Sequence, residues 1–192
     1  MIDYFPLKAC ARYEYDYESS EFGGPARAVI VILSVKKSGT HTAAYARLSV
    51  KLKGHSTCLD YFIRKTKEGV VTEDGIVTGG RLEFPFPLKK GRKWNSYPDA
   101  SEIVSLAEKV SVPAGNFSGC LKIQTLLAGG DAGSAVRCYA PGVGYVSESY
   151  DGEDIRAQVK LLSVSRASKE ELKPKKRCVK KRICCNAKTR PH

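Results

Sequence analysis

Several features that mark common classes of protein are missing from this sequence of 192 residues. No apolar run approaches the ~20 residues that a membrane-spanning helix needs. The opening stretch MIDYFPLK has neither a basic region nor an apolar core, so no export signal is expected there. The length suffices for one domain that buries most of its apolar surface without disulfides or metal ions. These absences predict a soluble globular chain without a transmembrane segment.

Short motifs that carry chemistry are also absent. There is no C-x-x-C pair for a redox or zinc centre, no H-E-x-x-H helix and no G-x-S-x-G nucleophile turn. His41 and His55 stand near turns without a carboxylate spacing around them, so solvated loop histidines are expected. The loop AGGDAGSA at 128–135 lacks the G-K-[ST] ending of a phosphate loop and precedes a strand, which favours a hairpin. The sequence therefore predicts no catalytic residue, no metal ligand and no cofactor.

Positive charge is concentrated at the end of the chain. The net charge is +12, but residues 166–192 hold eleven Lys or Arg against two Asp or Glu, while residues 1–165 are nearly balanced. Such a tail is typical of a solvated, disordered extension. Contact with nucleic acid or an anionic surface through this tail stays open and would be salt-sensitive. A metal site at Cys178, Cys184, Cys185 and His192 is disfavoured, because adjacent cysteines are poor ligands for one tetrahedral ion.

The residues that are present show strand periodicity. Aromatic or apolar residues alternate with polar ones in 4–18 and 44–53, and 26–37 is a β-branched run. Shorter strands are expected at 58–66, 69–72 and 81–84, and the last strand at 155–164. The stretch 100–112 could be a helix capped by Asp99 or Ser101, but its alternation and the lack of a Gly stop favour a strand.

Two segments of the chain echo one another. FPLKKGRKW at 86–94 lies over FPLKACARY at 5–13 with an identical Phe-Pro-Leu-Lys. This echo predicts an internal duplication of about 5–84 and 86–164. We therefore expect an all-β, antiparallel protein of about twelve strands in two similar rounds. It would fold as one domain over 1–165, as a β-sandwich or a curved, half-open barrel.

The stretch 110–146 carries the clearest architectural signal, with four strands joined by two tight turns and a Gly-Gly pair. Gly129-Gly130 favours a two-residue hairpin loop of the primed type. The opposing pairs are then Leu121 with Cys138 and Ile123 with Val136, which gathers apolar side chains on one face. The other face carries Cys120, Lys122, Gln124, Arg137 and Tyr139. Ile123 is therefore predicted to be buried and Lys122 exposed.

A register shifted by one residue is the alternative for this hairpin. It sets Cys120 against Cys138 at disulfide distance, but it also places Leu121 opposite Arg137 on the buried face. Because a one-residue slip exchanges the two faces of a strand, the hydrophobic pattern favours the first register. No disulfide is then expected between these two cysteines. The Pro141-Gly142 pair that follows is expected to form a turn in which glycine takes a positive φ.

FPLKKGRKW, VPAGNFSGCLKI and YAPGVGYV resemble a motif set of uncharacterised bacterial secreted or lipoprotein-like β domains: P-L-x-x-G-x-x-W, V-P-A-G-x-F-x-C-x-K and Y-A-x-G-V-G-x-V. The similarity covers most of 86–164 and, more faintly, 5–75. It implies an all-β protein of the cell envelope without an assigned activity. The motif positions, to which the hairpin adds two glycines, look structural: Trp94, Pro113, Gly115, Phe117, Cys120, Gly129, Gly130, Tyr139 and Gly142. The chain departs from this set in its missing export signal and its basic tail, so a cytoplasmic location stays open.

Three functional hypotheses follow. The leading one is a non-catalytic binding or scaffold domain of the bacterial cell envelope, whose concave sheet holds an apolar small molecule or lipid. The second is a binder of nucleic acid or an anionic surface through residues 166–192. The third is a hydrolase with an unrecognised site, which requires histidines or paired carboxylates to converge in a cleft.

Overall fold

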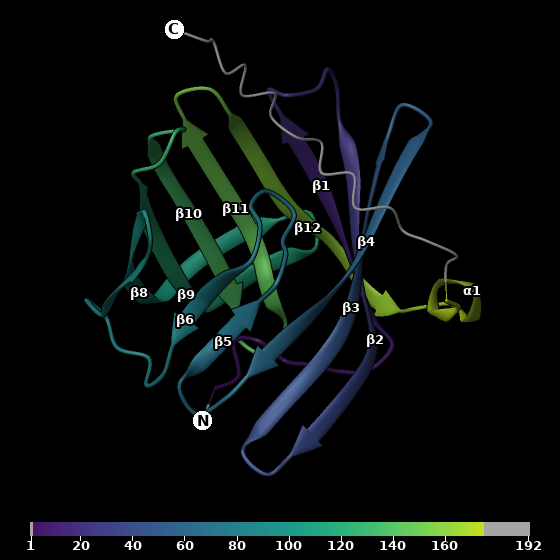
Figure 1. Ribbon diagram of the computed structural model, residues 1–192, viewed down its shortest axis with the longest axis horizontal. Coiled ribbons are helices and arrows are strands. Elements are labelled where there is room, and N and C mark those ends of the chain that lie inside the picture. Colours follow the sequence, from purple (N-terminus) through teal and green to yellow (C-terminus); the bar gives the residue numbers. More distant parts are fainter. Residues whose placement is uncertain (1, 175–192) are drawn as a thin grey trace, which may run out of the picture.

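The computed structural model describes residues 2–174, and these form an antiparallel sheet with one short helix (Figure 1). The strands are β1 (Ala11–Ser19), β2 (Ala26–Ser38), β3 (His41–Leu52), β4 (His55–Lys65), β5 (Gly69–Thr72), β6 (Arg81–Pro85), β7 (Lys93–Ser96), β8 (Asp99–Val112), β9 (Gly115–Leu127), β10 (Gly133–Ala140), β11 (Gly144–Gly152) and β12 (Arg156–Arg166), followed by the helix α1 (Lys169–Leu172). The predicted all-β, antiparallel class with twelve strands is confirmed. The stretch 100–112 is a strand, as its alternation predicted.

The twelve strands follow one another around a single, nearly closed, barrel-shaped sheet. Their order in the sheet is β6-β5-β4-β3-β2-β1-β12-β11-β10-β9-β8-β7. Every two neighbouring strands are therefore consecutive in the chain, except β1 and β12. The half-open barrel is therefore the correct alternative, and the sandwich is not. Strands β1–β6 and β7–β12 form two meanders of six strands each on either side of that pairing. The duplication itself stays a prediction.

The barrel has a seam between its two edge strands, β6 and β7, which are not joined by a ladder of backbone hydrogen bonds. Trp94 on β7 crosses this seam, and its indole Nε1 donates a hydrogen bond to the carbonyl of Leu82 on β6 at 3.3 Å. This Trp is one of the motif positions expected to be structural. Its position indicates that it helps to close the sheet.

One end of the barrel is filled by aromatic side chains. This closed end carries the turns that follow β2, β4, β6, β8 and β10. Both Phe-Pro-Leu-Lys segments reach it: Phe5 and Phe86 pack against Phe84 at ring-centroid distances of 6.3 and 5.9 Å. Tyr139 packs on Phe84 at 5.2 Å. The other end, with the turns that follow β1, β3, β5, β7, β9 and β11, is called the open end below.

The β10–β11 turn was predicted correctly. The amide of Val143 donates to the carbonyl of Ala140 at 3.2 Å, which closes a four-residue turn. Gly142 has φ +70°, a value that favours glycine, and Pro141 precedes it. The Gly142 amide donates to the Asp3 carbonyl at 2.7 Å and so fastens the N-terminal segment at the closed end.

The predicted register of the β9–β10 hairpin is wrong. Leu127 pairs with Gly133, and the paired residues inside the hairpin are Ile123 with Arg137 and Lys122 with Cys138. The loop therefore spans residues 128–132, and neither of its glycines adopts a positive φ. Arg137 consequently points into the barrel, while Val136 lies on the outer side. Ile123 is buried as predicted, but Lys122 is only partly exposed.

Longer-range contacts explain why the two-residue turn does not form. Asp131, inside the loop, accepts hydrogen bonds from the amides of Asp154 and Ile155, so it fastens this loop to the β11–β12 turn. Gly133 lies so close to β11 that a Cβ would come within 2.1 Å of the Asp151 carbonyl oxygen. The loop is therefore shaped by the neighbouring hairpin rather than by its own glycines.

Cys120 and Cys138 are both free and buried, as expected of a chain without this disulfide. They do not lie on opposite faces, because the corrected register puts both on the outer side of the sheet. The N-terminal segment lies beside Cys120, since the Tyr4 hydroxyl donates to the carbonyl of Gly119 at 2.8 Å. Burial raises the pKa of Cys120 to about 11, which makes its thiol a poor nucleophile.

The folded part continues beyond Ser165, where the sequence predicted its end. Ala167 is buried, and Ser168 begins α1 with a capping box that includes Glu171. The short helix packs on the outside of the sheet near β2 (Figure 1). In the described part of the chain, no helix has the length and apolar character required to cross a membrane.

Candidate functional site

A cavity of about 1220 Å³ occupies the open end of the barrel. Its lining comes from nearly every strand and from three of the turns at that end, those that follow β1, β5 and β7. The apolar and aromatic residues of the lining are Tyr17, Phe22, Leu48, Val50, Leu59, Ile76, Val77, Leu82, Tyr97, Leu127, Ala135 and Tyr150. The concave groove expected from the sequence is therefore present, although its lining is not apolar throughout.

The loop of residues 73–80, between β5 and β6, covers part of the cavity. Ile76 at its tip is buried in the core of the barrel. The two ends of the loop lie against each other, since a Cβ on Gly80 would come within 2.6 Å of the Glu73 carbonyl oxygen. Arg81 donates a hydrogen bond from Nη1 to the hydroxyl of Thr78 and so connects the loop to the charged groups below.

Charged side chains form the floor of the cavity, in the middle of the barrel. Arg81 Nε donates to Glu83 Oε2 at 3.0 Å, and Arg81 Nη2 donates to Glu148 Oε2 at 3.4 Å. Thr72 donates to the other oxygen of Glu83 at 2.8 Å. The two carboxylates are almost inaccessible, with side chains 5% and 1% exposed. Buried charges of this kind need nearly complete pairing to be tolerated.

Two tyrosines from the aromatic end complete the pairing of the carboxylates. Tyr145 donates its hydroxyl to Glu148 at 2.6 Å, and Tyr139 donates to Glu83. Burial, together with the adjacent carboxylate, raises the pKa of both tyrosines well above its ordinary value. Burial alone would raise the pKa of Glu83, but the charges of Arg81 and Arg137 and the two hydroxyl hydrogen bonds hold it below the usual value. Glu83 is therefore ionised at neutral pH.

Arg137 is the one member of this charged floor whose pairing is incomplete. Its Nη2 donates to Thr125 Oγ1 at 2.8 Å, while Nη1 lies 4.0 Å from Glu83. The Nε atom is buried and has no hydrogen-bond partner. A buried donor without a partner costs roughly 1–3 kcal/mol. Other atoms of Arg137 line the cavity, while the Nε atom itself is enclosed.

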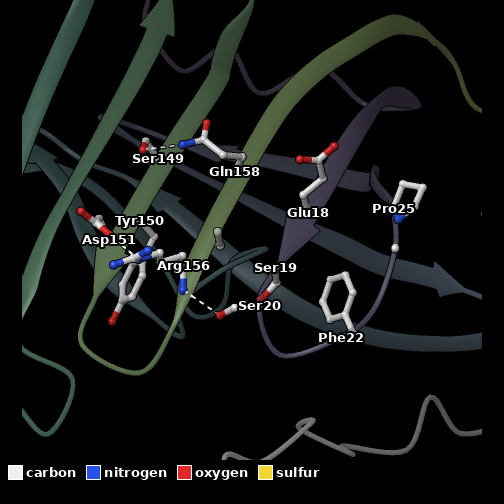
Figure 2. Close-up of a pocket in the computed structure, with 12 residues that line it drawn as sticks. Glu18, Ser19, Ser20, Phe22, Pro25, Ser149, Tyr150, Asp151, Arg156 and Gln158 are labelled. Carbon is white, nitrogen blue, oxygen red and sulfur yellow. Dashed lines mark hydrogen bonds and ion pairs between the residues drawn. The ribbon is translucent and has the colours of Figure 1, made fainter.

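A second, smaller hollow of about 650 Å³ lies beside the first, at the rim between β1, β11 and β12 (Figure 2). It shares Phe22 and Tyr150 with the larger cavity. Its polar groups pair with one another: the Arg156 amide donates to Ser20, Gln158 donates to Ser149, and the Arg156 guanidinium pairs with Asp151. This last pair is largely exposed to water, so a ligand would gain little by binding to it.

The residues that the motifs marked as structural are dispersed over the fold. Gly115 begins β9, and Phe117 and Cys120 are packed on the same strand. Pro113 belongs to the β8–β9 turn, and Gly129 and Gly130 belong to the β9–β10 loop. Tyr139 alone reaches the charged floor, through its hydroxyl. The structure therefore gathers none of them into a site except this tyrosine.

The two histidines do not converge. His41 begins β3 at the closed end and His55 begins β4 at the open end, and both are exposed. The strand between them implies a separation of about 35 Å at 3.3 Å per residue. Within residues 2–174, no three His, Cys, Asp or Glu side chains are grouped so that they could hold a metal ion. The tail cysteines and His192 lie outside the described residues, as does most of the basic tail.

Sequence reasoning missed the charged floor altogether. Arg81 and Glu83 alternate with apolar residues on a short strand, a pattern that normally marks a solvent-exposed face. The only available signal was the closure of the sheet, which brings these side chains into the barrel. Such a signal requires the topology to be known first.

Two bacterial proteins are among the solved structures that share this fold. One, from Bacteroides fragilis, is described as exported and as having a YmcC-like fold; it is 14% identical, with a TM-score of 0.66, and the match covers 86% of this chain and 100% of that one. The other, from Parabacteroides distasonis, is described as a lipoprotein; it is 12% identical, with a TM-score of 0.60, and the match covers 85% and 99% of the two chains. No protein-family model matches the chain, and no curated protein sequence matches it significantly. At these identities the likeness shows the fold alone.

Proposed function

We propose that this chain is a non-catalytic binding domain that holds a largely apolar small molecule in the cavity at the open end of its barrel. The observation that carries this proposal is the cavity of about 1220 Å³ inside a nearly closed sheet. Small-molecule sites are typically concave spaces of about 300–1,000 Å³ with mostly apolar walls and a few polar groups. The twelve apolar and aromatic residues of the lining supply such walls, although the cavity is larger than that range and polar residues, among them Asp74 and Asp99, complete its lining. The separation of the two histidines removes one of the two arrangements that a hydrolase would need.

A neutral fluorescent probe, N-phenyl-1-naphthylamine, tests this proposal. We expect its fluorescence to rise on binding to the wild-type protein. Ala135 is buried and lines the cavity, so Ala135→Phe should fill part of the space and weaken binding by about ten-fold, or about 1.4 kcal/mol. Ala107 is exposed on β8, and Ala107→Phe is the matched control that should bind normally. Absence of binding by the wild type, or equal binding by Ala135→Phe, would contradict the proposal.

We also propose that the protein acts in the bacterial cell envelope. The support is the likeness of its fold to proteins described as exported and as a lipoprotein, together with the motif resemblance. Fractionation of cells that produce the protein, followed by detection with an antibody, is the test. Recovery entirely in the cytoplasmic fraction would rule out this location.

A further inference from the structure

We propose that the ligand of this cavity carries a carboxylate that pairs with Arg137, and that the remainder of the ligand is a long apolar chain. This inference rests on the proposed function, because it names the ligand class for the same cavity. It follows from the distribution of charge on the cavity floor and from the walls above it.

The charge of Arg137 is the least compensated on the floor. Both carboxylates lie within 3.4 Å of nitrogens of Arg81. Each of them also accepts at least one hydroxyl hydrogen bond: Glu148 from Tyr145, and Glu83 from Thr72 and Tyr139. The carboxylate nearest to Arg137 is 4.0 Å away. The two acids therefore have close partners other than Arg137, and the 4.0 Å contact of Arg137 with Glu83 is the longest ion pair on the floor.

The donors of Arg137 suit a carboxylate. Nε has no partner, and among the described residues Nη1 makes only the long contact to Glu83. A guanidinium presents its donors in a planar fork that matches the two oxygens of a carboxylate. Because the Nε atom is enclosed in this structure, the proposal includes a small rotation of the guanidinium toward the cavity when the ligand binds. The side chain is only 4% exposed, so an anion there would interact with little screening from water.

An apolar chain fits the apolar part of the cavity wall. Leu48, Val50 and Leu59 form a wall on β3 and β4, and Ile76 and Val77 cover it from the loop of residues 73–80. Phe22 and Tyr97 line the cavity from the turns that follow β1 and β7, at the open end. A carboxylate bound on the floor would leave its chain running along this wall toward the rim.

Displacement of the neutral probe by two ligands that differ only in their head group tests the inference. Oleate and oleyl alcohol have the same chain, and each is titrated below its aggregation limit. We expect oleate to displace the probe from the wild type at a concentration at least about ten-fold lower than the alcohol. Arg137→Gln should remove that preference. Arg27→Gln is the matched control, since Arg27 is half exposed on β2, and it should keep the preference.

The outcomes distinguish a failure of the carboxylate inference from a failure of the proposed binding function. If the probe binds and the two ligands displace it equally from the wild type, the carboxylate inference is wrong while the proposed function stands. If the probe binds and neither ligand displaces it, the long-chain ligand is wrong. A preference that persists in Arg137→Gln would assign the carboxylate to another residue. If Arg137→Gln does not fold, the wild-type comparison decides the head group, and Arg137→Lys, which keeps one charge without the fork, should reduce the preference.

Discussion

Two arginines of this protein are almost equally buried and very differently paired. Arg47, on the outer face of β3, and Arg137, inside the barrel, are 3% and 4% exposed. Arg47 donates from Nε and Nη2 to the two oxygens of Asp60 at 2.7 and 2.8 Å. Its Nη1 donates to the carbonyls of Glu171 and Lys173 at the end of α1. Every nitrogen of Arg47 is used, whereas Arg137 has an Nε without a partner.

This difference indicates that burial does not by itself identify a functional residue. Arg47 fastens the C-terminal segment to the sheet, and its environment is complete in the folded chain. Arg137 is equally withdrawn from water, but the folded chain does not satisfy it. A buried donor without a partner is uncommon in folded proteins and calls for an explanation, of which a missing ligand is one. The inner arginine is therefore the better candidate for a ligand contact.

The largest effect on stability is expected from removing the Glu83 carboxylate from the charged floor of the cavity. Glu83→Gln should destabilise the protein by about 3–5 kcal/mol, because it leaves the buried Arg81 with Glu148 as its remaining counter-ion and removes the carboxylate nearest to the buried Arg137. Urea unfolding at neutral pH measures this loss. Glu102→Gln is the control, since Glu102 is 38% exposed and its pairing with Lys93 is at the surface, where a change within about 0.5 kcal/mol is expected.

A small loss of unfolding free energy in Glu83→Gln would mean that the charged floor of the cavity is loosely packed and accessible to water. Its arginines would then not be poised in a poorly solvated site, and the contrast between the inner and outer arginines would disappear. The same urea unfolding curves test this possibility. If water reaches the charged floor, the stability of Glu83→Gln should be close to that of the Glu102→Gln control.

A matched pair of substitutions compares the two arginines directly. Arg47→Gln should cost about 2–3 kcal/mol, since it removes a bidentate pair with Asp60 and two hydrogen bonds to carbonyls. Arg137→Gln should cost about 1 kcal/mol, because the lost hydrogen bond to Thr125 is partly offset by removing an unpaired donor. Thermal and urea unfolding provide both values. Equal losses would show that Arg137 is a structural residue like Arg47.

The error in the β9–β10 register has the same physical origin as this contrast. The predicted register requires an apolar buried face of the hairpin, with Val136 inside and Arg137 outside. The inner face of this barrel instead carries charged and hydroxyl groups, among them Arg137 and Thr125. Alternation of residue types reveals two faces, but it cannot show which one is buried when the interior holds paired charges.

Other elements were accessible to sequence reasoning because their signals are local. The long alternating strands and the Pro141-Gly142 turn depend on neighbouring residues, and both were predicted correctly. The β9–β10 loop depends on Asp131 reaching a different hairpin, and the end of the folded part depends on Arg47 binding α1. These contacts join residues far apart in the chain, and a single sequence does not indicate which distant residues will meet.

A smaller effect is expected from pH. The pKa of Glu83 is lower in the folded protein than in the unfolded chain, so its stabilisation is complete above the unfolded value of about 4.3. That stabilisation is lost as the pH falls through the lower, folded value. The difference in unfolding free energy between wild type and Glu83→Gln should therefore be smaller at pH 3 than at pH 6. A difference that does not change between these pH values would exclude an ionised Glu83.

The smallest effect on stability is expected at the seam of the barrel. It should loosen the strand beside the charged floor, which includes Arg137, and leave the surroundings of Arg47 unchanged. Trp94→Phe removes the hydrogen bond to the Leu82 carbonyl, which is worth about 1 kcal/mol. β6 carries Arg81 and Glu83, so amide hydrogen exchange in β6 should accelerate about five-fold. Exchange around Arg47 on β3 should not change, because that strand is paired on both sides. Equal acceleration on β3 would mean that the barrel opens as a whole and that the two arginine sites share one stability.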